Sequence, residues 1–124
     1  MEIWINPACS KCRTATAALD EAGIAYSVRR YLDDPPSAEE LIEVLDRMGL
    51  EPWDIARMSE EPAAALKSLP KDSEHRADWI AAMVAAPILI QRPIITADDG
   101  TTVVGRDPAT LAQVVGDRPH PSDG

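Results

Sequence analysis

The first thirty residues carry a strand–helix–strand pattern, and this pattern limits the possible folds more than any other feature of the chain. Residues 2–5 form a short apolar segment typical of a strand, which Asn6-Pro7 ends. From residue 11 to residue 22 small and apolar residues recur at helical spacing, and Gly23 is a typical helix stop. Residues 24–31 then alternate, which indicates a second strand. Together they predict a βαβ unit with parallel strands.

The middle of the chain is predicted to be helical. The sequence Ser37-Ala38-Glu39-Glu40 fits a capping box, in which a serine and a glutamate satisfy free backbone N–H groups at a helix start. The helix that it begins should end at Gly49. Short helical pieces are expected around residues 53–58 and 63–69, separated by Pro62.

The last third of the chain is predicted to contain a helix followed by strands. The helix is expected at about 73–86. The residues expected to form its buried stripe are Ala77, Ile80, Ala81 and Val84. Residues 94–96 and 101–104, joined by an Asp-Asp-Gly turn, predict a β-hairpin. A final helix should begin at the N-cap Asp107 and end at Gly116.

This order of elements predicts the fold class. It is βαβ, then a helical segment, then ββα, which is typical of an α/β, thioredoxin-like fold with an inserted helical segment. We therefore expect a single thioredoxin-like domain over residues 1–116, with the helical insertion at about 37–86. Residues 117–124 are polar and contain prolines, so they are expected to form a flexible C-terminal tail.

Charge and hydropathy exclude several classes of function. The 124 residues include 12 Lys and Arg against 21 Asp and Glu, a net charge of −9, which argues against direct binding to nucleic acid. The sequence has no apolar run of about 18 residues and no basic, apolar leader, so neither a membrane span nor a signal peptide is predicted. We expect a cytoplasmic protein, and nothing in the sequence demands more than a monomer.

The only two cysteines, Cys9 and Cys12, form a Cys-x-x-Cys pair between the first strand and the first helix. Such a loop places a sulfur beside backbone N–H groups and the positive end of a helix, which favours a nucleophilic thiolate. Half of a zinc site is an alternative, but His75 and His120 lack the spacing of the two further ligands, so no metal is predicted. A pair of inert buried cysteines is another alternative, and redox or nucleophilic use is the preferred interpretation.

Four segments together resemble one family. They are Asn6-Pro7-Ala8-Cys9-Ser10-Lys11-Cys12-Arg13, Tyr31-Leu32-Asp33-Asp34-Pro35-Pro36-Ser37, Pro87-Ile88-Leu89-Ile90-Gln91-Arg92-Pro93-Ile94 and Gly105-Arg106-Asp107-Pro108. In these segments, and from residue 2 to about 116, the chain resembles the arsenate reductases that are coupled to glutaredoxin.

The resemblance implies a mechanism. Cys9 matches the cysteine with which that family attacks arsenate, and Pro93 matches a cis-proline beside it. The residues implied to hold the oxyanion are Arg57, Arg92, Arg106 and Ser10. Guanidinium groups suit the tetrahedral oxygens of such an anion. Arg92 also lies between two apolar runs, residues 88–90 and 94–96, that are both expected to be strands.

The chain departs from well-studied members at two positions. Ile5 stands where they have a histidine four residues before the nucleophile, so activation of Cys9 must depend on the helix start and on nearby cations such as Lys11 and Arg13. Cys12 stands where they have no thiol, so an internal disulfide with Cys9 is possible. No bound cofactor is expected. The electrons should come from an external thiol reductant, either glutathione with glutaredoxin, or thioredoxin or another thiol system.

Two other functions remain open. The related Spx-type regulators also have Cys-x-x-Cys here, bind RNA polymerase and use the pair as a redox switch, although they lack an arginine at the position of Arg106. A general thiol–disulfide oxidoreductase is the third interpretation, but it would not need three arginines. The sequence therefore favours an arsenate reductase that acts in arsenic detoxification, with arsenate or a similar oxyanion and a redoxin electron donor as its partners.

Overall fold

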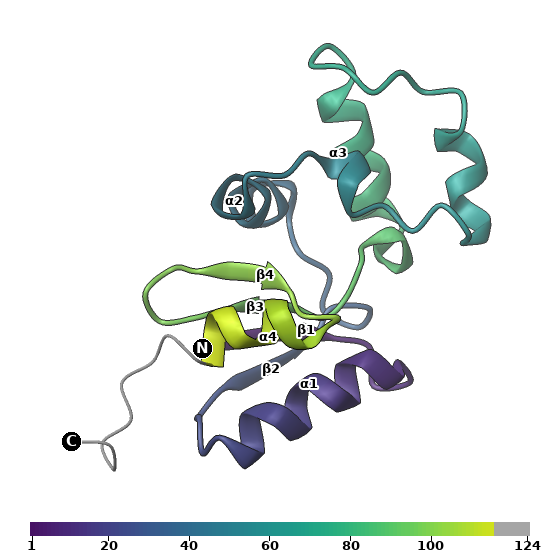
Figure 1. The fold of residues 1–124 in the computed structure, drawn as a ribbon. Helices are drawn as coiled ribbons and strands as arrows, with labels where there is room; N and C mark the ends of the chain where they lie inside the picture. Colours follow the sequence, from purple (N-terminus) through teal and green to yellow (C-terminus); the bar gives the residue numbers. More distant parts are fainter. Residues whose placement is uncertain (116–124) are drawn as a thin grey trace. The chain divides into compact units, whose positions relative to one another are not determined.

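The structure, a computed structural model, describes residues 1–115. The chain divides into two compact units (Figure 1). The first unit contains residues 1–29 and the chain from residue 92 onward, and the second contains residues 30–91. The predicted insertion at about 37–86 falls inside the second unit. Gly116 and the predicted tail at 117–124 lie outside the described residues.

A four-stranded sheet, in the order β2-β1-β3-β4, is the centre of the first unit. Its strands are β1 (Glu2–Ile5), β2 (Ser27–Arg30), β3 (Ile94–Thr96) and β4 (Thr102–Val104). Strand β3 pairs antiparallel with both β1 and β4, so the predicted hairpin is confirmed. Strand β2 is shorter than the alternating segment at 24–31 suggests, and its Val28 is 49% exposed.

Two helices complete the first unit, α1 (Ser10–Glu21) and α4 (Pro108–Val115). They contact each other and pack on the same face of the sheet. The residues of this core are Ile3, Ala15, Leu19, Ile95, Ala97, Val103 and Val114. The alternating side chains of the strands and the helical spacing of the apolar residues in α1 and α4 therefore meet in one core.

Local sequence signals set the ends of both helices. Helix α1 stops where Gly23 adopts a φ of +71°, and the N–H of Ile24 donates to the carbonyl of Leu19, as in a Schellman motif. Helix α4 starts where the Asp107 carboxylate accepts from the N–H of Thr110 at 2.8 Å. Both predictions, a stop at Gly23 and an N-cap at Asp107, are confirmed.

The second unit consists of helical segments. Helix α2 (Ala38–Met48) begins with the predicted capping box of Ser37 and Glu40 and ends at Gly49, whose φ is +67°. The segment after it forms two 3-10 turns, η1 (Pro52–Asp54) and η2 (Glu61–Leu66). The prediction that Pro62 separates two helical pieces was wrong, because proline is accepted in a first helical turn and Pro62 lies at the start of η2.

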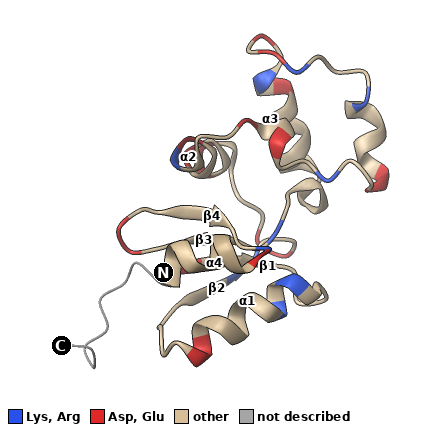
Figure 2. Ribbon diagram, viewed as in Figure 1, with Lys and Arg blue, Asp and Glu red and all other residues tan. Residues whose placement is uncertain are grey.

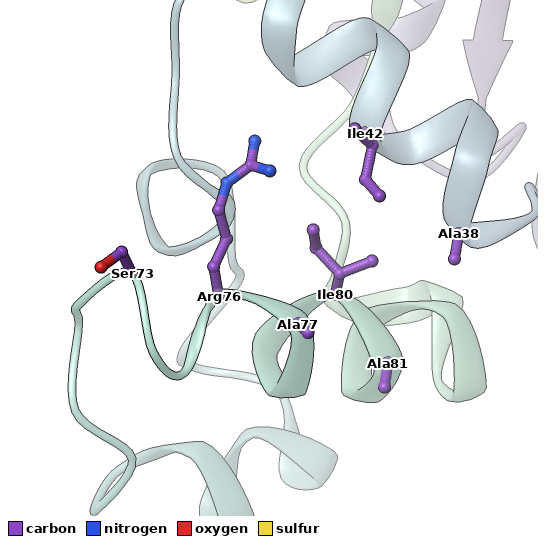
Figure 3. Close-up of a pocket in the computed structure, with 7 residues that line it drawn as sticks. All are labelled: Ala38, Ile42, Ser73, Arg76, Ala77, Ile80 and Ala81. Atoms are coloured by element: carbon purple, nitrogen blue, oxygen red, sulfur yellow. The ribbon is translucent and has the colours of Figure 1, made fainter.

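Helix α3 (Arg76–Ala85) buries Ile80 as predicted, but the rest of its buried face differs from the predicted stripe. Its buried residues are Trp79, Ile80 and Met83, whereas Ala77 and Ala81 are exposed. Larger side chains bury more apolar surface, and Trp79 also meets Trp53 edge to face at 6.0 Å. The two alanines instead line a groove of about 320 Å³ beside Ala38 and Ile42 of α2 (Figure 3).

The segment before Arg92 also differs from the prediction. Residues 88–90 were expected to be a strand, but Pro87–Leu89 form a 3-10 turn, η3. Proline fixes its own φ near the helical value and thus favours this turn. Only Ile90 follows extended geometry, and it makes an isolated bridge to Ala56. No helix within residues 1–115 has both the length and the apolar character needed to cross a membrane.

Gly105 allows α4 to approach the sheet closely, and this gives a testable prediction. A Cβ at this position would lie 2.7 Å from Ile95 Cδ1 and 3.0 Å from Leu111 Cδ2. Overpacking of this kind costs about 1–3 kcal/mol, so Gly105→Ala should lower the free energy of unfolding by that amount in urea titrations. Ile95→Val removes the closer methyl group. In that background the same substitution should cost less, and an equal cost in both would contradict the steric explanation.

Candidate active site

Cys9 is the N-cap residue of α1, in the loop that follows β1. Its backbone is extended, with φ −85° and ψ 124°, and its side chain is half-buried. The N–H of Cys9 donates to the carbonyl of Asn6 at 2.9 Å. The first N–H groups of α1 have no partners inside the helix, so the sulfur lies where a negative charge is favoured.

The surroundings of Cys9 lower its pKa to about 7. Burial alone would raise the pKa of this thiol. The N–H and the thiol of Cys12, the guanidinium of Arg92 and the N–H of Lys11 outweigh burial, because they stabilise the thiolate. The lowered pKa means that Cys9 is thiolate, the nucleophilic form, to a larger extent at neutral pH than a free cysteine is.

Cys12 behaves in the opposite way. It is 1% exposed, and this burial raises its pKa to about 11, although the N–H of Asn6 and the charge of Arg92 act against it. The negative charge on Cys9 also raises the pKa of Cys12, so the two thiols do not ionise together. The pair thus contains one reactive, accessible sulfur and one protonated, buried sulfur.

Arg92 and Arg106 lie in the same unit as Cys9. Arg92 is only 6% exposed, and its guanidinium acts on the Cys9 sulfur. Arg106 Nη1 donates to the carbonyl of Arg92 at 2.6 Å, so the two residues are directly linked. The peptide bond between Arg92 and Pro93 is cis, the isomer that the resemblance implied.

The remaining residues of the loop are more exposed. Ser10 is the first residue of α1 and is exposed, as are Lys11 and Arg13. Arg13 Nη1 donates to the carbonyl of Pro7 at 3.2 Å, and the charge of Lys11 contributes to a lowered pKa of Asp107, after the N–H and hydroxyl of Thr110. In Figure 2 the start of α1 carries blue, basic segments.

Arg57 belongs to the second unit, and its described contacts lie there. Its Nη1 donates to Gln91 Oε1 at 2.6 Å, and its Nε donates to Glu60 Oε2 at 3.2 Å. The second unit is acidic, with thirteen acidic and six basic residues. The structure thus brings Cys9, Cys12 and Arg92 together in the first unit, with Arg106 hydrogen-bonded to Arg92. Arg57 belongs to the second unit.

Asn6 is a functional candidate that the sequence interpretation treated only as a strand breaker. Its signal was visible, since an asparagine followed by proline favours a tight turn with its own side chain as acceptor.

For metals, the described part of the chain contains no group of three or more His, Cys, Asp or Glu side chains that could hold an ion.

The chain is similar to several known proteins. The profile of the ArsC family matches residues 4–114. A Streptomyces viridochromogenes protein, described as an uncharacterized protein in the glnII region, is 61% identical over 86% of this chain and 91% of its own length. An arsenate reductase of Neisseria meningitidis is 35% identical, over 86% and 90% of the two chains. The solved arsenate reductase of Vibrio cholerae is 34% identical, with a TM-score of 0.71 over 94% and 97%. This similarity to a solved structure confirms the predicted α/β, thioredoxin-like fold.

The ionisation of Cys9 gives the second prediction. The rate of alkylation by iodoacetamide, measured by mass spectrometry at Cys9, should rise with pH and reach half its maximum near pH 7. Arg92→Gln should move this midpoint to higher pH, because it removes a cation that stabilises the thiolate. The groups that lower the pKa of Cys9 are Cys12, Arg92 and the N–H of Lys11, rather than the charges of Lys11 and Arg13 that the sequence suggested. Arg13→Gln is therefore the matched control and should leave the midpoint unchanged. A wild-type midpoint near that of a free thiol would refute the activation of Cys9.

Proposed function

The chain belongs to the ArsC family, and from that premise we propose that it reduces arsenate to arsenite with Cys9 as the nucleophile. The observation that carries the proposal is the setting of the Cys9 sulfur, which interacts with the first turn of α1 and with the buried Arg92. An anionic substrate needs cations beside the attacking thiolate, because two negative charges repel each other.

The first step forms a bond between sulfur and arsenic. The Cys9 thiolate attacks the arsenic of H₂AsO₄⁻, and one oxygen leaves as hydroxide, which a buffer acid in the solvent protonates to water. The product is a Cys9–S–AsO₃H⁻ adduct, in which arsenic is still As(V). Arsenate carries about −1.5 charges near neutral pH, by analogy with phosphate. Arg92, Arg106 and Ser10 are proposed to hold its oxygens, and guanidinium groups also stabilise the charge that develops on the leaving oxygen.

The second step transfers the electrons. A second thiolate attacks the sulfur of Cys9, a disulfide forms, and the electron pair of the S–As bond stays on arsenic, which leaves as As(III) and takes up protons to become arsenite. We propose Cys12 as this resolving thiol. Cys12 is buried and keeps its proton while Cys9 is a thiolate, so the two thiols do not compete for the first attack, and Cys12 loses its proton when it attacks the Cys9 sulfur.

Arg57 is proposed as the third oxyanion ligand, on the basis of the resemblance alone. Its hydrogen bond to Gln91 and its ion pair with Glu60 fix the orientation of its guanidinium. A fixed guanidinium loses less entropy when it binds an anion. Arg57→Gln should therefore mainly raise the KM for arsenate, and an unchanged KM would remove Arg57 from the site.

The disulfide that closes each turnover must be reduced from outside. The incoming thiolate has access to Cys9, which is half-buried, rather than to Cys12, which is 1% exposed. Glutaredoxin with glutathione, or thioredoxin, supplies such thiols in the cytoplasm, and there we propose that the protein takes part in arsenic detoxification. No bound cofactor takes part in this scheme.

A redox switch without turnover is a second candidate, because the cysteine pair alone would support it. The interaction between the Cys9 and Cys12 thiols is the observation in its favour. A switch, however, does not require Arg92 and Arg106 to be linked next to the reactive sulfur. The two candidates differ in one property, which is arsenate-dependent consumption of reductant.

An assay of arsenate-dependent turnover tests this property. Arsenate-dependent oxidation of NADPH should be measured with glutathione, glutaredoxin and glutathione reductase, and separately with thioredoxin and its reductase. We expect turnover with at least one system and none in Cys9→Ser. Arg92→Gln should lower kcat/KM on the order of a hundredfold, because it removes one group that stabilises developing charge.

Two controls complete the experiment. Arg13→Gln should keep wild-type kcat/KM, since the guanidinium of Arg13 is exposed and donates to the carbonyl of Pro7 rather than acting on the Cys9 sulfur. Cys12→Ser should lose turnover with thioredoxin and keep some with glutathione, which can resolve the adduct from solution. If the wild-type protein gives no turnover in either system but closes a disulfide under mild oxidation, the redox switch replaces the enzyme.

A further inference from the structure

Asn6 shapes the loop that leads to Cys9. The N–H of Cys9 donates to the main-chain carbonyl of Asn6 at 2.9 Å, which closes a turn over Pro7 and Ala8. The side chain of Asn6 makes a second bond in the same turn, because its Oδ1 accepts from the N–H of Ala8 at 3.0 Å. Proline at the second position of such a turn restricts φ, and an asparagine at the first position mimics a backbone turn.

The same residue also reaches the second cysteine. The main-chain N–H of Asn6 interacts with the Cys12 sulfur and lowers its pKa, against the larger effect of burial, which raises it. The carbonyl of Asn6 holds the backbone of Cys9, and its N–H acts on the sulfur of Cys12. One residue thus contacts both members of the pair, from the strand side of the loop.

We propose that Asn6 is a positioning residue for the cysteine pair, and that its side chain stabilises the turn in which Cys9 and Cys12 can exchange between dithiol and disulfide. Asn6 does not contact the reacting atoms of a substrate in this scheme and acts through the two cysteines. The inference deepens the proposed function, because the Cys9–Cys12 disulfide is its resolving step.

The exchange can be measured without arsenate. Oxidised dithiothreitol accepts the electrons. One thiolate of the pair attacks its disulfide and forms a mixed disulfide. The second cysteine attacks the protein sulfur of that mixed disulfide, and reduced dithiothreitol leaves, so the protein loses two protons and two electrons while dithiothreitol gains them. The equilibrium constant of this reaction reports how well the loop presents the two sulfurs to each other. Its failure is therefore distinguishable from a failure of arsenate turnover.

The experiment compares the wild type with four variants in dithiothreitol redox buffers, with alkylation and mass spectrometry to count the oxidised fraction. Asn6→Ala should lower the equilibrium constant for the Cys9–Cys12 disulfide about tenfold, because the turn loses one hydrogen bond. Asn6→Ser should recover part of the loss, since its hydroxyl can accept from the N–H of Ala8 more weakly. Thr16→Ala removes a bond to the carbonyl of Arg13 and is the matched half-buried control, with a wild-type constant expected.

A charged variant separates the effect of the turn on the disulfide from the effect of charge on the Cys9 thiolate. Asn6→Asp keeps an acceptor for the N–H of Ala8 but adds a negative charge near Cys9. Its disulfide constant should stay within about threefold of wild type, while the pH midpoint of Cys9 alkylation should move upward. The proposal is overturned if Asn6→Ala lowers only the urea midpoint and leaves the redox constant and the alkylation midpoint unchanged. It is also overturned if the wild-type pair forms no disulfide.

Discussion

The chemistry of this protein depends on the point where α1 begins. Cys9 is the residue before the first helical turn, and that turn offers N–H groups that no carbonyl of the helix can reach. The rest of the first unit keeps this point in place. The sheet and α4 bury Ala15 and Leu19 of α1. The chain returns to the site at Arg92, which adds a buried cation to the helix start.

Elements with a local signal could be predicted from the sequence, whereas those set by competition between side chains could not. The capping box at Ser37 and the stop at Gly23 follow from residues within one turn. The buried face of α3 could not be predicted, because helical spacing allows either a stripe through Ala77 or one through Trp79, and only tertiary packing decides between them. The prediction of a strand at residues 88–90 failed for a related reason, since an apolar run is compatible with a strand or a short helical turn.

The site was predictable in part. Cys9 and Cys12 are recognisable from their spacing, and Arg92 from an arginine between apolar runs, which is unusual on a surface. The contrast between the two thiols could not be predicted, because it depends on burial and on contacts made through Asn6, Arg92 and the first helical turn. Membership of the ArsC family predicts the fold, while the proposed activity depends on how Cys9, Cys12 and Arg92 bind an anion and react with it.

The most direct test of the account is a single turnover without any external thiol. Fully reduced protein is mixed with excess arsenate, and arsenite and the disulfide state of the chain are both quantified after a quench. If Cys9 attacks and Cys12 resolves, about one arsenite per chain forms together with one Cys9–Cys12 disulfide, and neither forms in Cys9→Ser. If no arsenite forms, even after glutathione is added, Cys9 is not an arsenate nucleophile and the central claim is wrong.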